Sequence, residues 1–225
     1  MNHLEPQPDA VRLDETQSVS ALVQRPADEP RACYVFAHGA GAGMTHAFMA
    51  EVAAGLARRG IATLRFQFPS MERGARRTDP PAVAHAAVRA AVAHAATLFP
   101  GMPLFAGGKS FGGRMSSQAQ ALAPMAGVAG LVFVGFPLHP DGAPSSERAR
   151  HLFDIRIPML FLQGTRDKLA EFGRIEKLAA ELGPTSTLVP IAEADHGFHV
   201  LVRSGRTDGE VMAQLLDAAA AWMLR

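Results

Sequence analysis

The stretch LFAGGKSFGGR, residues 104–114, decides how this chain folds. Its first three residues are apolar and are typical of a short buried strand, and a run with helical character starts at Phe111. Residues 108–112 between them fit the pattern G-x-S-x-G, with Ser110 in the middle. Between a strand and a helix, this pattern predicts a sharp turn that holds the serine hydroxyl above a sheet edge. A glycine-rich turn with no further role is the alternative interpretation.

On both sides of this stretch, short apolar segments alternate with longer alanine-rich segments. The pattern predicts strands at residues 34–37, 62–66, 104–106, 130–134, 158–163 and 187–190, and helices at 45–59, 81–99, 111–123, 170–182 and 207–224. Weak alternation from Val11 to Val23 adds an antiparallel edge hairpin. Right-handed crossovers then place helices on both faces of a mainly parallel sheet, with the strands' carboxyl ends along one edge. We expect any active site at that edge.

Composition indicates an ordinary globular protein. The chain has 225 residues, of which 48% are apolar and 19% charged, and its formal net charge is +1. These values fit one domain over residues 1–225, with residues 1–10 expected to be disordered. The near-neutral charge gives no support to a nucleic-acid or membrane-surface partner, so we expect a small-molecule partner. The uncharged residues 115–138 are interrupted by proline and glycine, and are therefore expected to be a helix end, a turn and a strand.

Cys33 is the only cysteine, so the chain cannot form an intramolecular disulfide. It leads an apolar strand, which fits a buried thiol in a reducing compartment better than a catalytic one. The first fifteen residues carry several acidic residues and no apolar run of the kind that a signal peptide needs. We therefore expect a cytoplasmic protein.

A serine hydroxyl needs a base and a carboxylate to become a nucleophile, and the sequence offers both. Asp167 follows the strand predicted at residues 158–163, and His196 lies in the loop after the strand at 187–190. The order Ser110, Asp167, His196 and the placement of each at a strand end predict a catalytic triad. Asp195 is the rival carboxylate. Because a sequence neighbour more often points away from a histidine ring, Asp167 is the expected partner and Asp195 is expected to fix the loop.

Other readings of these motifs are weaker. The residues GGKS at 107–110 resemble the end of a phosphate-binding loop, but the first glycine of that pattern would fall at Pro103. No spacing typical of a metal site occurs, so neither metal nor cofactor is expected. A non-catalytic binding or scaffold protein on the same fold remains the main alternative.

The chain resembles a small member of the alpha/beta-hydrolase superfamily, similar to dienelactone-hydrolase-like proteins and to the short predicted hydrolases of the KAN and testis-expressed type. The motifs that carry the resemblance are HGAGAG at residues 38–43, LRFQFP at 64–69, GKSFGGR at 108–114, QGTRD at 163–167 and DHGFH at 195–199. It implies an alpha/beta-hydrolase fold, here with no room for a large cap domain. The nucleophile of dienelactone hydrolases is a cysteine, whereas position 110 is serine, so their substrate is not implied.

The resemblance also implies an oxyanion hole, formed by backbone N–H groups fixed before the reaction. Phe111 is expected to supply one, and Ala40, with Gly41 as the near alternative, the other. His38 is expected to brace this loop. The implied activity is that of a serine hydrolase, carboxylesterase- or thioesterase-like, which cleaves a small acyl substrate through an acyl-enzyme intermediate.

Cations near the serine suggest a bias toward anionic substrates. Only three lysines occur, and one of them, Lys109, adjoins Ser110, while Arg114 follows closely. Arg76 and Arg77 lie in a segment after a predicted strand end and are candidates to bind a carboxylate or phosphate. Solvated side chains are the alternative for all four residues. The sequence does not indicate an oligomeric state.

Overall fold

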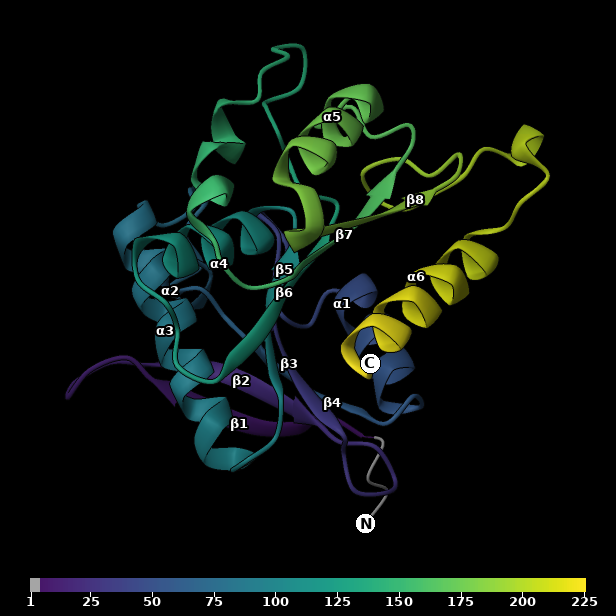
Figure 1. Cartoon of the computed structure of the whole chain (residues 1–225). Coiled ribbons are helices and arrows are strands. Elements are labelled where there is room, and N and C mark those ends of the chain that lie inside the picture. The colour runs from purple at the N-terminus through teal and green to yellow at the C-terminus, as the bar shows by residue number, and fades with distance from the viewer. Residues whose placement is uncertain (1–4) are drawn as a thin grey trace.

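The computed structural model describes residues 5–225 and contains an eight-stranded sheet (Figure 1). The strand order is β1-β2-β4-β3-β5-β6-β7-β8. The pairs β1–β2 and β2–β4 are antiparallel, and the other five pairs are parallel. The strands are β1 (Gln7–Arg12), β2 (Ser18–Gln24), β3 (Ala32–Ala37), β4 (Ile61–Phe66), β5 (Leu104–Lys109), β6 (Val128–Val134), β7 (Met159–Gly164) and β8 (Ser186–Ile191).

Burial explains which strands lie in the middle of the sheet. All six residues of β3, β4 and β7 are buried, as expected for strands covered by helices on both faces. By contrast, β1 at the sheet edge is mostly exposed and pairs with β2 from Gln7 opposite Val23 to Arg12 opposite Ser18. The expected edge hairpin is therefore present. The expectation of a disordered start was wrong for residues 7–10, because they pair along β1; residues 1–4 lie outside the described part.

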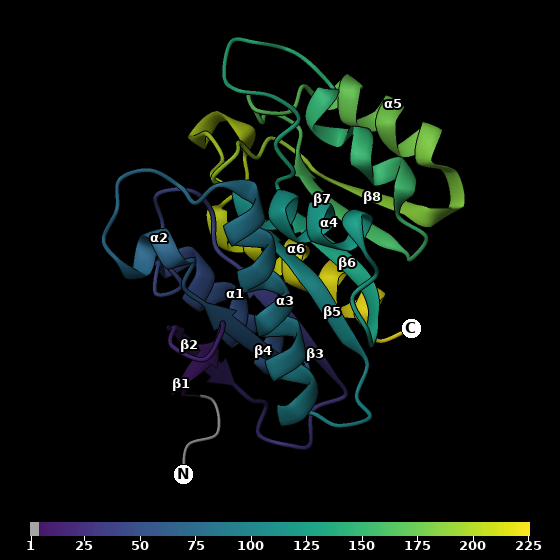
Figure 2. The same ribbon diagram turned by 90° about the vertical axis from the view of Figure 1, so that its left-hand side faces the viewer.

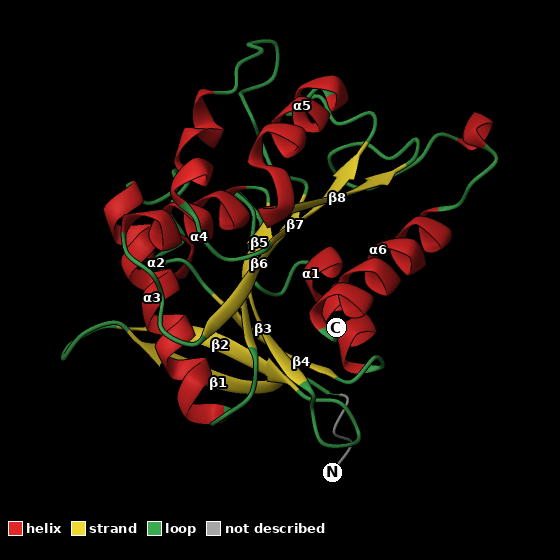
Figure 3. Ribbon diagram, in the orientation of Figure 1, coloured by secondary structure: helices red, strands yellow, loops and turns green. Residues whose placement is uncertain are grey.

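Helices cover both faces of the sheet (Figures 2 and 3). The apolar faces of α1 and α6 pack on one side, and those of α3, α4 and α5 pack on the other. The α-helices are α1 (Ala47–Ala57), α2 (Pro69–Glu72), α3 (Pro81–Leu98), α4 (Phe111–Leu122), α5 (Phe172–Leu182) and α6 (Asp208–Met223), and the 3₁₀ segments are η1 (Glu147–Asp154), η2 (Gly183–Thr185) and η3 (Val202–Ser204). The sheet is thus enclosed between two helical layers.

The predicted elements agree with the observed ones to within a few residues. The largest differences are at β1, which begins at Gln7 instead of Val11, and at β5, which continues to Lys109. Helix α1 begins at Ala47, after His46 accepts a hydrogen bond from the Phe48 N–H. Residues 115–138 form the end of α4, a turn and β6, as expected. Over residues 5–225, no helix has both the length and the apolar character to cross a membrane.

Candidate active site

Ser110 lies between β5 and α4 in a strained backbone conformation, with φ 49° and ψ −112°. Side-chain-bearing residues rarely take a positive φ, and here the surroundings enforce it. The Ser110 N–H donates to the Val134 carbonyl at 3.1 Å, which ties the turn to β6. A Cβ at Gly112 would lie 2.4 Å from the Ala37 carbonyl oxygen, so only glycine lets α4 start this close to β3. The predicted turn is therefore present.

The structure brings Ser110, His196 and Asp167 together although they are far apart in sequence. The Ser110 Oγ lies 2.9 Å from His196 Nε2, and His196 Nδ1 lies 2.7 Å from an Asp167 carboxylate oxygen. With Nδ1 donating to the carboxylate, Nε2 is left to accept the hydroxyl proton. This arrangement can convert a serine hydroxyl into a nucleophile.

The Asp167 carboxylate is completely buried, and both of its oxygens accept hydrogen bonds. Its Oδ1 accepts from the Leu169 N–H at 2.8 Å, and its Oδ2 accepts from the Gln163 side-chain amide at 2.7 Å. The carbonyl of the same amide accepts from the Phe136 N–H at 2.9 Å. A buried carboxylate is costly unless it is hydrogen-bonded, so these donors fix its position and its orientation toward His196. Gln163 is a site residue that the sequence analysis quoted only as part of a motif.

Asp195 points into its own loop. Its Oδ1 accepts from the Gly197 N–H at 2.8 Å and from the His199 N–H at 3.0 Å. The rival carboxylate therefore shapes the loop that carries His196, as the sequence analysis expected. Phe198 at the same turn takes a φ of 67°.

Three backbone N–H groups near Ser110 make no hydrogen bond within the described part of the protein. Among the described residues, the N–H groups of Phe111, Ala40 and Gly41 have no protein acceptor. Phe111 opens α4, where the first N–H groups have no partner within the helix. A Cβ placed on Gly39 would lie 3.8 Å from the Ser110 Cβ, so the loop that carries Ala40 lies against the serine.

The loop at residues 38–46 is held in place from β4 and the segment that follows it. His38 is buried; its Nδ1 pairs with the Gly39 carbonyl at 2.8 Å and its Nε2 accepts from the Phe68 N–H at 3.0 Å. Burial lowers the pKa of His38, which keeps the ring neutral and able to make both bonds. The expected bracing contact is present.

Two side chains that the sequence analysis did not single out anchor the far end of this loop. The buried Arg65 guanidinium donates to the Met44 carbonyl at 3.0 Å, and the Gln67 amide oxygen accepts from the Met44 N–H at 2.9 Å. Both lie in the quoted LRFQFP motif, whose alternation shows a strand but gives no hint of this contact. The motif therefore anchors the candidate oxyanion loop.

A cavity of about 500 Å³ opens beside Ser110. Most of its lining is apolar; besides Lys109, Ser110 and His196, the polar residues are His46, Glu51 and His199, which are all exposed. The residues around it include Ala40, Ala42, Ala47, Phe48, Met49, Lys109, Leu169 and His196. A cavity of this size and character suits the apolar part of a small substrate.

The four candidate substrate-binding cations lie in different places. Lys109 lines the main cavity, whereas Arg76 and Arg77 border a second cavity of about 20 Å³ on the other side of the Ala40 loop. Arg114 lines neither of these cavities; its guanidinium lies over the Phe111 ring at 5.8 Å, and its pKa is lowered by burial and by the charge of Arg148. Of the four, only Lys109 therefore lines the same cavity as Ser110.

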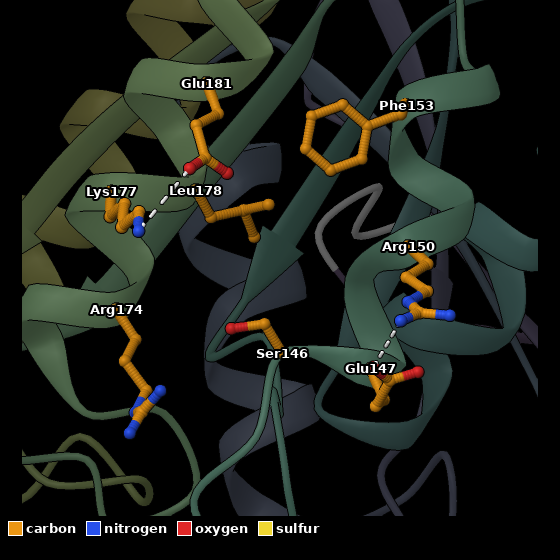
Figure 4. A pocket seen from close by; sticks show the side chains of 8 residues that line it. All are labelled: Ser146, Glu147, Arg150, Phe153, Arg174, Lys177, Leu178 and Glu181. Carbon is orange, nitrogen blue, oxygen red and sulfur yellow. Dashed lines mark ion pairs between the residues drawn. The ribbon is translucent and has the colours of Figure 1, made fainter.

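A separate pocket of about 260 Å³ lies between η1 and α5 (Figure 4). Four of its charged side chains pair with one another, Arg150 with Glu147 at 2.8 Å and Lys177 with Glu181 at 3.9 Å, and Arg174 pairs with Glu171 outside the pocket. Such exposed pairs within one helical segment are common and contribute little. The residues drawn include no histidine, so this pocket has no base for its Ser146.

Comparison with known proteins identifies the family. A model of the alpha/beta hydrolase domain matches residues 30–224. The chain belongs to the alpha/beta hydrolase family. The hydrolase fold predicted from the sequence, with a mainly parallel sheet and no large cap, is therefore confirmed.

Solved structures of alpha/beta hydrolases resemble the chain over almost its full length. An alpha-beta serine hydrolase homologue from Coxiella burnetii matches with a TM-score of 0.76 at 20% identity, covering 94% of this chain and 96% of that one. A lidless serine hydrolase from Xanthomonas campestris matches with a TM-score of 0.75 at 20% identity, covering 97% and 95%. A dienelactone hydrolase from Anabaena variabilis has a TM-score of 0.76 at 18% identity, covering 99% and 98%. At these identities the likeness concerns the fold.

Proposed function

We propose that this alpha/beta hydrolase is a serine hydrolase that cleaves an ester or thioester of a small substrate. One observation carries the proposal: an unbroken chain of hydrogen bonds from the Ser110 hydroxyl through His196 to the buried Asp167 carboxylate. This chain supplies a nucleophile, a base and a group that orients the base, which together define the triad mechanism.

In the proposed reaction, Ser110 Oγ attacks the acyl carbon while its proton passes to His196 Nε2. The proton then goes to the departing alcohol or thiol, which leaves Ser110 acylated. A water molecule, deprotonated by His196, attacks the acyl carbon and releases the carboxylic acid, and the proton returns to Ser110. Asp167 stays ionised throughout and stabilises the imidazolium that forms in each half.

The negative charge on each tetrahedral intermediate would be bound by the N–H groups of Phe111 and Ala40, or of Gly41 in place of Ala40. Their lack of protein acceptors supports this role, because donors already fixed in place need no reorganisation during the reaction.

The substrate class follows from the cavities. The apolar lining of the larger cavity favours an uncharged acyl or alcohol group of modest size. The exposed Arg76 and Arg77 beside the smaller cavity favour an additional carboxylate or phosphate at its rim. The proposed partner is therefore a small molecule, and the proposed compartment is the cytoplasm, which suits the buried, reduced Cys33.

A panel of p-nitrophenyl and thioester substrates tests the proposal. We expect the wild-type protein to hydrolyse at least one acyl class and Ser110→Ala to lose nearly all of that activity. Ser146→Ala is the matched control, because its exposed hydroxyl has no histidine partner. An active Ser110→Ala protein would contradict the mechanism, and an inactive wild-type protein would favour the non-catalytic alternative.

A further inference from the structure

Lys109 and Ser110 of the GKSFGGR motif both reach the loop that carries His196: Ser110 contacts the imidazole, whereas the Lys109 side chain contacts the backbone. Its ammonium donates a hydrogen bond to the His196 backbone carbonyl. Among residues 5–225, no carboxylate lies within ion-pair distance of this ammonium. Burying a cation without a direct counter-ion costs free energy of desolvation. We therefore ask what the Lys109 ammonium does beside Ser110.

Four segments converge on the Lys109 side chain. A Cβ on Gly39 would lie 3.7 Å from its Cγ, so the stem packs along the candidate oxyanion loop. The ammonium lies 5.2 Å from the Phe198 ring centre and 5.8 Å from that of Phe48, within the range of cation–π attraction. The two rings are stacked with 5.7 Å between their centres. The lysine therefore links the serine turn, the oxyanion loop, α1 and the His196 loop.

Gly135 lies against the Lys109 ammonium and leaves space for it. Gly135, directly after β6, has a φ of 69°, and a Cβ there would lie 3.1 Å from Lys109 Nζ and 3.6 Å from His196 Cε1. Glycine thus leaves room for the ammonium and the imidazole side by side.

From this convergence, we infer that Lys109 is a positioning residue, whose ammonium holds the backbone of His196 so that the imidazole meets the Ser110 hydroxyl. The inference rests on the proposed serine hydrolase function. It predicts an effect on the chemical step, since displacing a catalytic group by about 1 Å can cost about 100-fold in rate.

The main test compares Lys109→Met, an unbranched side chain one atom shorter that has no donor, with Lys109→Gln, which keeps an N–H donor without charge. Lys177→Met is the control, because Lys177 is exposed on α5. Fluorophosphonate titration counts the competent sites in each preparation. We expect kcat per competent site to fall about 10- to 100-fold in Lys109→Met, less in Lys109→Gln and not in Lys177→Met, with KM for a neutral ester changed less than about twofold.

The pH dependence of kcat distinguishes a role of the Lys109 charge from a mere loss of packing. Burial lowers the pKa of Lys109 to about 8, opposed by the charges of Asp167 and Asp195, the carboxylates that act on it. We therefore expect the kcat of the wild type to decline above about pH 8 as the ammonium is lost, and that decline to be absent from Lys109→Gln. All other titrating groups are shared by the two proteins, so the difference reports Lys109.

Three results would overturn the inference: kcat of Lys109→Met within about twofold of wild type, identical pH profiles for wild type and Lys109→Gln, or a rise in KM with kcat unchanged, which would make Lys109 a substrate contact. If Lys109→Met fails to fold, the Lys109→Gln comparison decides the same question. An active wild type with an inactive Ser110→Ala protein and an unaffected Lys109→Met protein would refute this inference alone and leave the proposed function standing.

Discussion

At Ser110 the backbone takes a conformation that costs about 1 to 3 kcal/mol for a residue with a side chain, and its neighbours are built to maintain it. Gly108 and Gly112 let β5 and α4 approach the Ala37 carbonyl, and the Val134 carbonyl holds the Ser110 N–H. Strain of this kind persists only where the surroundings over-determine it. It therefore marks Ser110 as the residue for which the local structure is organised.

The role of the Asp167 carboxylate can be separated from that of Asp195 by substitution. Asp167→Asn replaces one of two oxygens that both accept hydrogen bonds with an NH₂ donor, so the tautomer of His196 is no longer fixed and we expect kcat to fall about 10⁴-fold. Asp195→Asn retains the side-chain oxygen that accepts from Gly197 and His199, so a much smaller loss is expected. Steady-state kinetics on the best ester of the panel measures both. Equal losses, or the larger loss in Asp195→Asn, would reverse the assignment.

The sequence predicted those site residues that lie in a recognisable motif or directly after a predicted strand. Ser110, Asp167 and His196 each follow a predicted strand, so the fold alone brings them to one edge. Gln163, Arg65 and Gln67 were not recognised as site residues, because their partners are backbone groups of other segments. Such contacts leave no periodicity or spacing in a single sequence.

Among the elements, β3, β5 and α4 set the geometry of the serine turn, and Gly112 is where they come closest. Gly112→Ala would place a Cβ 2.4 Å from the Ala37 oxygen and 2.7 Å from the His38 oxygen. We expect a loss of about 1 to 3 kcal/mol in the free energy of unfolding, together with reduced activity as the adjoining loop shifts.

Gly209→Ala in α6 is the matched control for this substitution, since its nearest neighbour would lie 3.9 Å away. Urea unfolding of both variants measures the difference. A Gly112→Ala protein as stable and as active as Gly209→Ala would show that the close approach has no role.

The 3₁₀ segment η1 docks on α4 through His151, whose Nε2 lies 2.7 Å from the Ser117 Oγ. Burial, followed by the charge of Arg114, lowers the pKa of His151 to about 4. The unfolded chain therefore binds a proton between about pH 6.5 and 4 that the folded protein does not, and stability falls as the pH falls through this window.

Between pH 7 and pH 4 the free energy of unfolding should fall less in His151→Gln than in the wild type. We expect the difference to be about 2 kcal/mol, after allowing for the partial exposure of the ring. His199 is the contrasting case, because its hydrogen bond to Asp208 raises its pKa. His199→Gln should therefore not reduce the acid sensitivity. Urea unfolding at several pH values decides this, and an unchanged acid dependence in His151→Gln would contradict it.

The sequence predicted the long helices and strands but not the short helical segments. Helices and central strands have long apolar patterns and were found, whereas α2, η1, η2 and η3 were not. Three of these four are only three or four residues long, and η1 follows a loop rich in proline and glycine. Their conformations depend on docking against the sheet and its helices, which one-dimensional patterns do not show.

Over the whole molecule, the chain is an alpha/beta hydrolase in which little is added to the sheet and its two helical layers. The cavity beside Ser110 is consequently bounded by the candidate oxyanion loop, α1 and the His196 loop. Three alanines of this lining, Ala40, Ala42 and Ala47, have small side chains that take up little of the cavity.

Filling this space should change which acyl groups are accepted. We expect Ala42→Phe to lower kcat/KM for octanoyl esters at least about 10-fold while acetyl esters are much less affected, because the larger ring occupies the apolar part of the cavity. Ala143→Phe, in the exposed loop before η1, is the control. A uniform loss for all chain lengths would indicate that the acyl group binds elsewhere.

The central claim is that Ser110 is a nucleophile activated by His196 and Asp167. Labelling with a fluorophosphonate probe, followed by peptide mapping by mass spectrometry, tests it most directly. We expect one stoichiometric adduct on Ser110 in the wild type, none in Ser110→Ala and strongly slowed labelling in His196→Ala. A wild-type protein that labels no faster than Ser110→Ala, or an adduct on another residue, would contradict it.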